Sequence, residues 1–212
     1  MKHKYIFLLG RPGCGKSALY RELEQQFLER GRAGTFERVD DFPILWAKLK
    51  RDDALEKAGK ERLYSERTSD GGYFITDDHV LDDILKEVSS DVLGIDKPDH
   101  VIFVEFARTY YVAAIQNFDE RILEQCIAIY MDVSFDTCWA RNVARCEGAG
   151  SADGDDHLVY REAMEALYLY DDQDAFVQYL KDRNIPVMVV NNESDGEEHL
   201  KRQVEVLLEE LF

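Results

Sequence analysis

Short apolar runs rich in β-branched and aromatic residues alternate along the chain with stretches in which apolar residues recur at helical spacing. Runs of this kind, bounded by polar or glycine-containing segments, are typical of buried strands. We predict strands at Tyr5–Leu9, Thr35–Val39, His100–Phe106, Ile127–Asp132 and Val187–Val190. The alternation predicts an α/β fold in which helices cover both faces of a parallel sheet.

The helical stretches have recognisable ends. The first is predicted to run from Lys16 to about Arg30, because Gly31 suits the left-handed conformation that ends a helix. Further helices are predicted at Phe135–Cys146, at Leu158–Arg183 and after a capping box at Ser194–Glu197.

About sixty residues separate the second and third strands, far more than a simple crossover needs. Within this segment we predict a helix at Pro43–Lys60, a loop or turn at Arg67–Tyr73 and a helix whose apolar stripe begins at Val80. We expect residues 42–90 to form a helical insert that covers a second substrate.

The small, acidic and glycine-rich stretch 147–157 is predicted to be a mobile loop or lid rather than a linker. No internal repeat or second domain is apparent. Residues 1–212 are therefore predicted to form one domain.

The segment Gly10–Ser17 reads Gly-Arg-Pro-Gly-Cys-Gly-Lys-Ser between the first predicted strand and the first predicted helix. It matches the phosphate-loop pattern G-x-x-x-x-G-K-S/T in the context that this pattern requires, which disfavours a chance glycine-rich turn. Backbone N–H groups of such a loop surround a polyphosphate, the lysine reaches its outer phosphates and the hydroxyl binds Mg²⁺. The predicted nucleotide-binding residues are Gly10, Arg11, Gly13, Cys14, Gly15, Lys16, Ser17 and Ala18.

Two adjacent carboxylates follow the second predicted strand, in the sequence Arg38-Val39-Asp40-Asp41-Phe42. Ligands of parallel sheets bind at this edge, so a carboxylate here could ligate Mg²⁺ or accept a proton from a substrate hydroxyl. The alternative is a helix N-cap before Pro43. Asp41 is better placed as the cap and Asp40 as the catalytic carboxylate, but the strand phase leaves the order open.

The third predicted strand contains the run Val-Ile-Phe-Val-Glu, which starts at Val101 and ends at Glu105. Arg108 follows three residues later. An acid after four apolar residues resembles the Walker B strand, so Glu105 could hold Mg²⁺ through water or act as a base. Arg108 would then face the pocket for the phosphate acceptor. The alternative is that Glu105 and Arg108 pair with each other.

Arg141 and Arg145 lie four residues apart, on one face of a predicted helix that ends at the acidic stretch. Two guanidinium groups beside a lid would suit the clamping of a phosphate. The alternative is a solvated basic face paired to Asp132 or Asp136. Asn191 and Asn192 follow the last strand, where they could pack on a nucleotide base or form a left-handed turn.

The chain of 212 residues carries 26 lysines and arginines against 43 aspartates and glutamates, a net charge of −17. This charge argues against nucleic acid or an anionic membrane as a partner, because both require phosphate neutralisation. No signal peptide or membrane span is apparent, and the four cysteines form no C-x-x-C pair. We therefore expect a cytoplasmic protein with free thiols.

Taken together, Gly10–Ser17, Asp40-Asp41, Glu105-x-x-Arg108 and Arg141/Arg145 resemble the P-loop kinases of the nucleoside and nucleotide kinase type. The resemblance implies the three-layer P-loop NTPase fold, with the strand order 2-3-1-4-5. It also implies ATP and Mg²⁺ as cofactors, the metal being held by Ser17, Asp40 and Glu105, and lid arginines on the transferred phosphoryl group.

The resemblance also implies catalytic roles for individual residues. Glu105-x-x-Arg108 is similar to the acid-then-arginine motif of deoxynucleoside and thymidylate kinases, and Asp40 is similar to the base that accepts the substrate proton. The implied catalytic residues are Lys16, Asp40, Glu105, Arg108, Arg141 and Arg145. Neither a base-recognition pattern for adenylate, guanylate or thymidylate nor an Asn-Lys-x-Asp motif occurs.

The favoured hypothesis is therefore a kinase that transfers phosphate from ATP to a small metabolite, such as a nucleoside, a nucleotide or another hydroxyl or phosphate acceptor. The alternative is a regulatory NTPase without a small-molecule acceptor. A polynucleotide kinase is disfavoured by the acidic charge and by the lack of a basic, aromatic-laced stripe. The sequence leaves open the acceptor, the preference between ATP and GTP and the oligomeric state. It also leaves open whether Asp40, Asp41 or Glu105 is the base or the Mg²⁺ contact.

Overall fold

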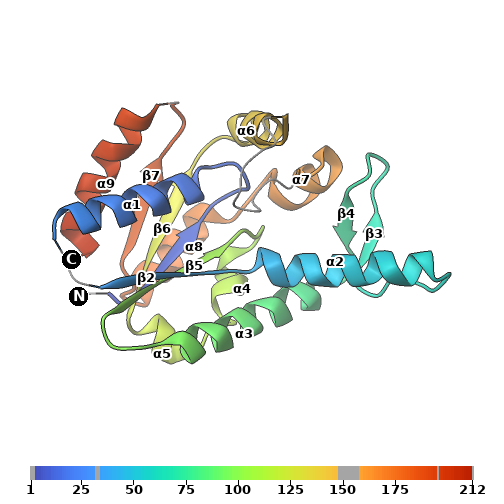
Figure 1. Cartoon of the computed structure of the whole chain (residues 1–212), viewed down its shortest axis with the longest axis horizontal. Helices are drawn as coiled ribbons and strands as arrows, with labels where there is room; N and C mark the ends of the chain where they lie inside the picture. The colour runs from blue at the N-terminus through green and yellow to red at the C-terminus, as the bar shows by residue number, and fades with distance from the viewer. Residues whose placement is uncertain (1–2, 32–33, 148–157, 195, 212) are drawn as a thin grey trace.

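Five parallel strands form the central sheet of the computed structural model, which describes residues 3–31, 34–147, 158–194 and 196–211 (Figure 1). The strands of this sheet are β1 (Tyr5–Leu9), β2 (Thr35–Asp40), β5 (His100–Phe106), β6 (Cys126–Asp132) and β7 (Val187–Asn191). Their spatial order is β2-β5-β1-β6-β7. Counted among these strands alone, this is 2-3-1-4-5, so the predicted sheet order is confirmed.

Helices cover both faces of this sheet and bury two clusters of apolar side chains, as a buried parallel sheet requires. On one face, α1 (Lys16–Glu29) and α9 (Glu197–Leu211) pack on alternate residues of the strands. On the other face lie α3 (Asp78–Ile95), α4 (Tyr111–Ile115), α5 (Glu120–Leu123) and α8 (Gln173–Asp182). The predicted three-layer arrangement is therefore confirmed.

Two further helices, α6 (Phe135–Glu147) and α7 (Arg161–Tyr168), lie above the carboxyl end of the sheet in Figure 1. A single helix was predicted over Leu158–Arg183, and this prediction is wrong because the chain breaks between α7 and α8. The break is held by two acidic side chains. Asp172 accepts hydrogen bonds from the backbone nitrogens of Tyr111 (2.6 Å) and Val112 (3.1 Å) at the start of α4.

Asp171 also stabilises the break between α7 and α8, through contacts with other segments than those of Asp172. Its carboxylate accepts a hydrogen bond of 2.7 Å from the Tyr130 hydroxyl and lies 2.8 Å from the Arg11 guanidinium. No glycine or proline marks this position in the sequence. The break therefore arises from tertiary contacts and not from local helix propensity.

The segment between β2 and α3 extends outward from the body of the protein. Helix α2 (Phe42–Lys57) leads away from the sheet, and an antiparallel hairpin of β3 (Ser65–Arg67) and β4 (Tyr73–Ile75) lies beside it (Figure 1). The predicted turn falls between these strands, but the strands themselves were not predicted. The predicted stripe from Val80 belongs to α3, whose Ile84 and Val88 are fully buried in the core.

The side chain of Asp52 in α2 anchors this hairpin. It is fully buried and accepts hydrogen bonds from the backbone nitrogens of Leu63 (2.8 Å), Tyr64 (3.0 Å) and Ser65 (2.8 Å), and from the Ser65 hydroxyl (2.8 Å). Burial opposes the charge of Asp52, but these hydrogen bonds outweigh it and hold its pKa below the ordinary value of 3.8.

We expect Asp52→Asn to destabilise the protein by roughly 2 to 3 kcal/mol at neutral pH, because an amide cannot accept all of these hydrogen bonds. The lowered pKa means that the advantage of Asp52 is complete above about pH 4 and declines as the pH falls below that value. Urea unfolding at several pH values measures both effects. Asp83→Asn, at an exposed position on α3, is the control and should change stability by less than about 0.5 kcal/mol. An Asp52→Asn effect that does not shrink in acid would contradict this account.

Candidate functional site

The loop Gly10–Ser17 joins β1 to α1 at the carboxyl edge of the sheet, where the sequence predicted it. Gly10, Gly13 and Gly15 have φ values of 131°, 84° and 105°, a region that side chains rarely adopt. The first helical turn begins at Lys16, so the loop opens onto the positive end of α1. This is the backbone arrangement that binds phosphate groups.

Neighbouring segments pack tightly around the loop. A Cβ atom on Gly13 would lie 2.3 Å from the carbonyl oxygen of Cys138 in α6. A Cβ atom on Gly15 would lie 2.5 Å from Nδ2 of Asn192, which donates a hydrogen bond of 2.9 Å to the carbonyl of Cys14. Neither Asn191 nor Asn192 has a positive φ, so a left-handed turn at these asparagines is wrong.

Two basic side chains of the loop, one near its start and one near its end, also fix its shape. Arg11 donates from Nε to the Tyr168 carbonyl (2.7 Å) and pairs with Asp171, which ties the loop to the break between α7 and α8. Lys16 is buried, and its Nζ donates to the carbonyls of Gly10 (2.8 Å) and Arg11 (3.1 Å). The loop therefore holds its lysine in place through its own backbone.

Cys14 is buried beneath the loop. Its burial raises the pKa of the thiol, and the nearby charge of Lys16 lowers it by less. The side chain therefore remains a neutral thiol that packs in the core.

Carboxylates from neighbouring strands meet beside the loop. The parallel register pairs Asp40 of β2 with Glu105 of β5. The guanidinium of Arg38 lies among them: its Nη2 is 2.7 Å from Glu105 Oε2, 3.4 Å from Asp40 Oδ2 and 3.2 Å from the hydroxyl of Ser17. Lys16 Nζ is 3.8 Å from the other oxygen of Glu105.

The pKa of Asp40 is raised to about 7. Burial is the main cause, and the charges of Glu105 and Asp41 add to it. The Phe42 N–H and the Arg38 guanidinium oppose this shift without cancelling it. A carboxyl group with a pKa near neutrality is suited to accept a proton during catalysis.

Asp41 and Arg108 form a buried ion pair, each side chain being 9% exposed. Arg108 also donates to the carbonyls of Ala107 (2.7 Å) and Leu81 (3.4 Å). The alternative pairing of Arg108 with Glu105 is therefore wrong. Asp41 does occupy the N-cap position of α2, as expected, but its side chain makes no capping hydrogen bond. Asp40 Oδ1 instead accepts a hydrogen bond from the Phe42 N–H (2.8 Å).

Arg141 and Arg145 of α6 both face the site. Arg141 donates to the carbonyls of Asn192 (2.9 Å) and Glu193 (3.4 Å), and Arg145 donates to the side chain of Asn142 (3.4 Å). The lid that was predicted over 147–157 lies outside the described residues, apart from its first position at the end of α6.

A single cavity of about 700 Å³ has most of the predicted residues on one side and an apolar wall on the other. Its polar side is lined by Asp40, Glu105, Arg108, Arg141 and Arg145 and, from the loop and the start of α1, by Gly13, Gly15, Lys16, Ser17 and Ala18. Gly10, Arg11 and Cys14 do not line this cavity. The structure thus brings the predicted catalytic residues to one cavity.

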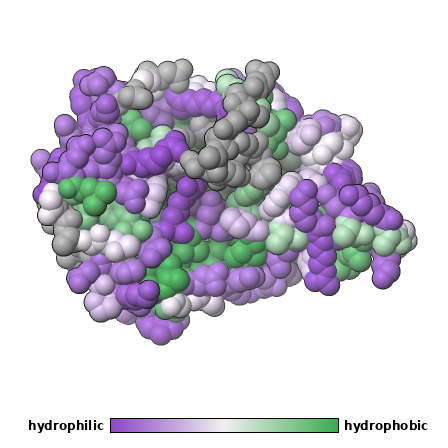
Figure 2. All heavy atoms as spheres, in the orientation of Figure 1, coloured by the Kyte–Doolittle hydropathy of each residue, from purple (hydrophilic) through white to green (hydrophobic). Residues whose placement is uncertain are grey.

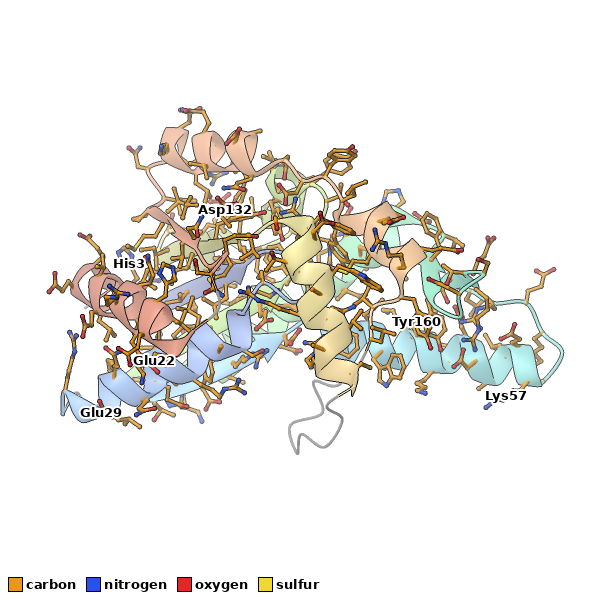
Figure 3. All side chains as sticks on the ribbon, turned by 90° about the horizontal axis from the view of Figure 1, so that it is seen from above. His3, Glu22, Glu29, Lys57, Asp132 and Tyr160 are labelled. Atoms are coloured by element: carbon orange, nitrogen blue, oxygen red, sulfur yellow. The ribbon has the colours of Figure 1, made fainter. Side chains whose placement is uncertain are left out.

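Sequence reasoning missed most of the opposite wall, which comes from α2, the hairpin and α7. The main apolar residues of this wall are Phe42, Leu45, Trp46, Tyr73, Tyr160 and Tyr168. The spacing of Leu45, Trp46 and Leu49 in α2 was a usable signal, but nothing local indicated that this helix faces the loop. Figure 3 shows the labelled Tyr160 between α7 and α2, whose far end is marked by Lys57.

The tip of the hairpin contacts α7 across the outer end of this wall. The backbone nitrogen of Ser69 donates to the Glu162 carboxylate (2.9 Å), and the Glu162 nitrogen donates to Asp70 (3.0 Å). Gly71 packs against the ring of Tyr160. Two segments that lie far apart in the sequence therefore form one rim.

Oxygen atoms at the inner end of the cavity can hold a divalent cation. Ser17, Asp40 and Glu105 supply the oxygen ligands that Mg²⁺ prefers, and Glu105 Oε2 is buried without a hydrogen-bond donor among the described residues. No group of three or more histidines, cysteines, aspartates or glutamates in the described ranges could hold a metal alone. These residues therefore fit an ion that completes its coordination with phosphate oxygens and water.

The face of the protein drawn in Figure 2 carries many hydrophilic residues with apolar patches between them, and the net charge of the chain is −17. No helix in the described part of the chain has the length and apolar character needed to cross a membrane.

No known family model matches the sequence, and no curated protein matches it. Solved structures do match over nearly the full length. Kti12 from Chaetomium thermophilum, in complex with ADP-AlF3, aligns with a TM-score of 0.58 at 14% identity over 97% of each chain.

Kinases that act on small molecules give similar alignments. A sugar kinase from a Janibacter species has a TM-score of 0.52 at 9% identity, over 97% of this chain and 94% of that one. The APS kinase of Mycobacterium tuberculosis, in complex with AMPPNP and APS, has a TM-score of 0.51 at 12% identity, over 99% and 98%. The chain therefore has the P-loop kinase fold that its motifs predicted.

Gly13 tests how closely α6 packs on the loop. We expect Gly13→Ala to destabilise the nucleotide-free protein by roughly 3 kcal/mol, because the methyl group meets the Cys138 carbonyl and the positive φ adds strain. Thermal unfolding measures this effect. Gly94→Ala is the matched control, since a Cβ atom there meets nothing within 4 Å and alanine favours helix. Equal melting temperatures for the two variants would contradict this packing account.

Proposed function

We propose that this protein is a phosphotransferase that uses ATP and Mg²⁺ to phosphorylate a small molecule. The observation that carries the proposal is the single cavity of about 700 Å³, which has the phosphate loop on one side and apolar side chains of α2, the hairpin and α7 on the other. We assign the loop side to the nucleotide phosphates and the apolar side to the acceptor. A kinase must place its acceptor beside the γ-phosphate, and one shared cavity permits this.

The inner half of the cavity is assigned to the donor. The loop N–H groups and the α1 N-terminus bind the ATP phosphates, and Lys16 supplies a charge that reaches their outer oxygens. Ser17 and Glu105 hold Mg²⁺, with Asp40 at the edge of the same group of oxygens. When bound, this ion neutralises negative charge on the transferred phosphoryl group.

Asp40 and the buried ion pair are assigned to the acceptor. The acceptor oxygen forms a bond to the γ-phosphorus as the bond from this phosphorus to the leaving oxygen of ADP breaks. Asp40 accepts the hydroxyl proton, a role supported by its position at the cavity wall between Ser17 and Phe42. Arg108 and Asp41 orient polar groups of the acceptor, and Arg141 and Arg145 stabilise the charge of the phosphoryl group.

The outer wall supports an acceptor that carries a flat ring. Phe42 and Trp46 are stacked with ring centroids 5.9 Å apart, and Trp46 meets Tyr73 edge to face at 6.2 Å. Such surfaces bind planar rings through stacked and edge-to-face contacts. Among nucleosides, nucleotides and other hydroxyl compounds, we therefore favour acceptors with an aromatic or heteroaromatic part.

Long polyanions are disfavoured as acceptors. The net charge of −17 gives no phosphate-neutralising surface, and the arginines of the site are few and lie inside the cavity. This argues against a polynucleotide substrate and leaves room for a small molecule that carries one or two phosphates.

The first test removes the charge of the loop lysine. Lys16→Ala should reduce phosphoryl transfer by at least about 10³-fold, because a positioned cation on the outer phosphates is lost. Radiolabelled ATP transfer measures the activity, and circular dichroism checks the fold. Lys60→Ala removes an exposed lysine beyond α2 and should keep full activity. Full activity of Lys16→Ala would contradict the proposed donor site.

The second test concerns the acceptor. A panel of nucleosides, nucleotides, other aromatic alcohols and aliphatic sugars should contain a compound that stimulates ATP consumption and becomes phosphorylated. For that compound, Trp46→Ala should raise KM at least about tenfold with a much smaller change in kcat, since ring contacts mainly bind the ground state. Phe74→Ala is the control, because Phe74 is an exposed aromatic residue of the same hairpin.

Failure of the whole panel would favour the other class of function. If no small molecule stimulates ATP consumption, and bound nucleotide instead changes the affinity for a protein partner, the protein is a nucleotide-dependent regulator. An acceptor whose KM is unchanged by Trp46→Ala would contradict the assignment of the apolar wall while leaving kinase activity intact.

A further inference from the structure

One nitrogen atom of Arg38 contacts oxygens from three separate segments. Nη2 lies 3.2 Å from the Ser17 hydroxyl of α1, 3.4 Å from Asp40 Oδ2 of β2 and 2.7 Å from Glu105 Oε2 of β5. The short approach to Glu105 is not a well-aligned hydrogen bond, since this oxygen has no donor among the described residues. The contact between Arg38 and Glu105 is therefore an attraction between opposite charges, as the contact of a metal ion with this carboxylate would be.

These oxygens are the ones that would surround a divalent cation beside the phosphate loop. A metal ion bonded to the Ser17 hydroxyl would lie about 2.1 Å from that oxygen. The Arg38 nitrogen already lies within contact distance of the same atom and of both carboxylates. The guanidinium and the metal ion would therefore compete for one space and for one set of negative charges.

We propose that Arg38 is a built-in counter-ion, which occupies the divalent-cation position in the nucleotide-free protein and leaves it when the metal–nucleotide complex binds. The inference rests on the proposed function in one respect, the assignment of these oxygens to the metal.

The charge balance explains why a counter-ion is needed here. Asp40 and Glu105 are side by side in neighbouring strands, and Asp41 is already neutralised by Arg108. Lys16 is the other cation near Glu105, at the longer distance of 3.8 Å. Without Arg38, the two remaining carboxylates would repel each other and would attract free divalent ions from solution.

Arg38 can leave this position without disturbing the sheet. It lies on β2, which is an edge strand, and 26% of its side chain is exposed. Its guanidinium carbon lies 5.8 Å from the centre of the Tyr20 ring on α1, within the range of cation–π attraction. A rotation of the side chain toward this ring and the solvent would vacate the space among the three oxygens.

The proposal has a consequence for metal binding. The wild-type protein should bind a free divalent ion weakly, because the ion must displace Arg38. An uncharged residue at position 38 should expose the oxygens and tighten binding of the metal alone.

The test is a titration of nucleotide-free protein with Mn²⁺, followed by electron paramagnetic resonance of the free ion. Arg38→Ala should bind one Mn²⁺ at least about tenfold more tightly than wild type, because a competing unit charge is removed at contact distance. Arg38→Met keeps the length and packing of the stem and should behave alike, which guards against misfolding of the alanine variant. Arg38→Lys should bind with an intermediate affinity.

Two controls separate this site from the general acidity of the protein. Arg121→Ala removes the same charge from an exposed ion pair with Asp119 and should leave the Mn²⁺ affinity within about twofold of wild type. Adding Ser17→Ala to Arg38→Ala should abolish the gained site. The proposal is overturned if neither Arg38→Ala nor Arg38→Met binds Mn²⁺ more tightly than Arg121→Ala, or if the gain survives Ser17→Ala.

This measurement uses neither ATP nor an acceptor. A protein that transfers no phosphate to any small molecule can still show the Mn²⁺ effect, and that result would reject the proposed kinase while supporting the role of Arg38. Active kinase with unchanged Mn²⁺ binding in the Arg38 variants would reject the role of Arg38 alone.

Discussion

Two carboxylates, Asp40 and Glu105, lie at the same register position of neighbouring strands at the carboxyl edge of the sheet. Like charges so placed repel each other, and burial removes the water that would screen them. The arrangement of the site follows from this constraint. Arg38 inserts between the carboxylates and Ser17, and Lys16 approaches from the loop. Asp40 keeps a pKa near 7, because burial and the charges of Glu105 and Asp41 raise it and the opposing contacts compensate only in part. The negatively charged carboxylates and the positively charged groups that bind them are thus gathered beside the phosphate loop.

The loop depends on its neighbours as much as on its own sequence. Two of its glycines, Gly13 and Gly15, are needed because α6 and Asn192 approach to distances that no Cβ atom tolerates. Arg11 ties the loop to Asp171, in the connection whose contacts also end α7. Phosphate binding and the break between two helices therefore share one set of interactions. A change in that connection would reach the nucleotide through the backbone of the loop.

The central sheet and the phosphate loop could be predicted from the sequence, because both depend on local residue patterns. Apolar runs identified the strands to within one residue, and the spacing of glycine, lysine and serine identified the loop. The partner of Arg108 could not be read in this way, since Asp41 lies 67 positions away and Glu105 was the nearer acid. The break after α7 was equally hidden, because acidic side chains bonded to α4 create it without glycine or proline. The predictable features were local, whereas these two missed features depend on contacts between charged or polar groups and segments far away in the sequence.

The two halves of the cavity rest on different kinds of support. Residues of the donor half stand on β2, β5 and the loop, whose side chains are fixed by the core and by register. The apolar wall stands on α2 and a short hairpin that is held by the buried Asp52 and joined to α7 at its tip. Substitutions in a wall attached in this way need not move β2 and β5, the strands whose residues lie beside the phosphate loop. Under the proposed function, the acceptor would contact mainly α2, the hairpin and α7, and the phosphates would contact the loop and the ends of β2 and β5. Phe42 links the two regions, because it belongs to the apolar wall and its N–H donates to Asp40.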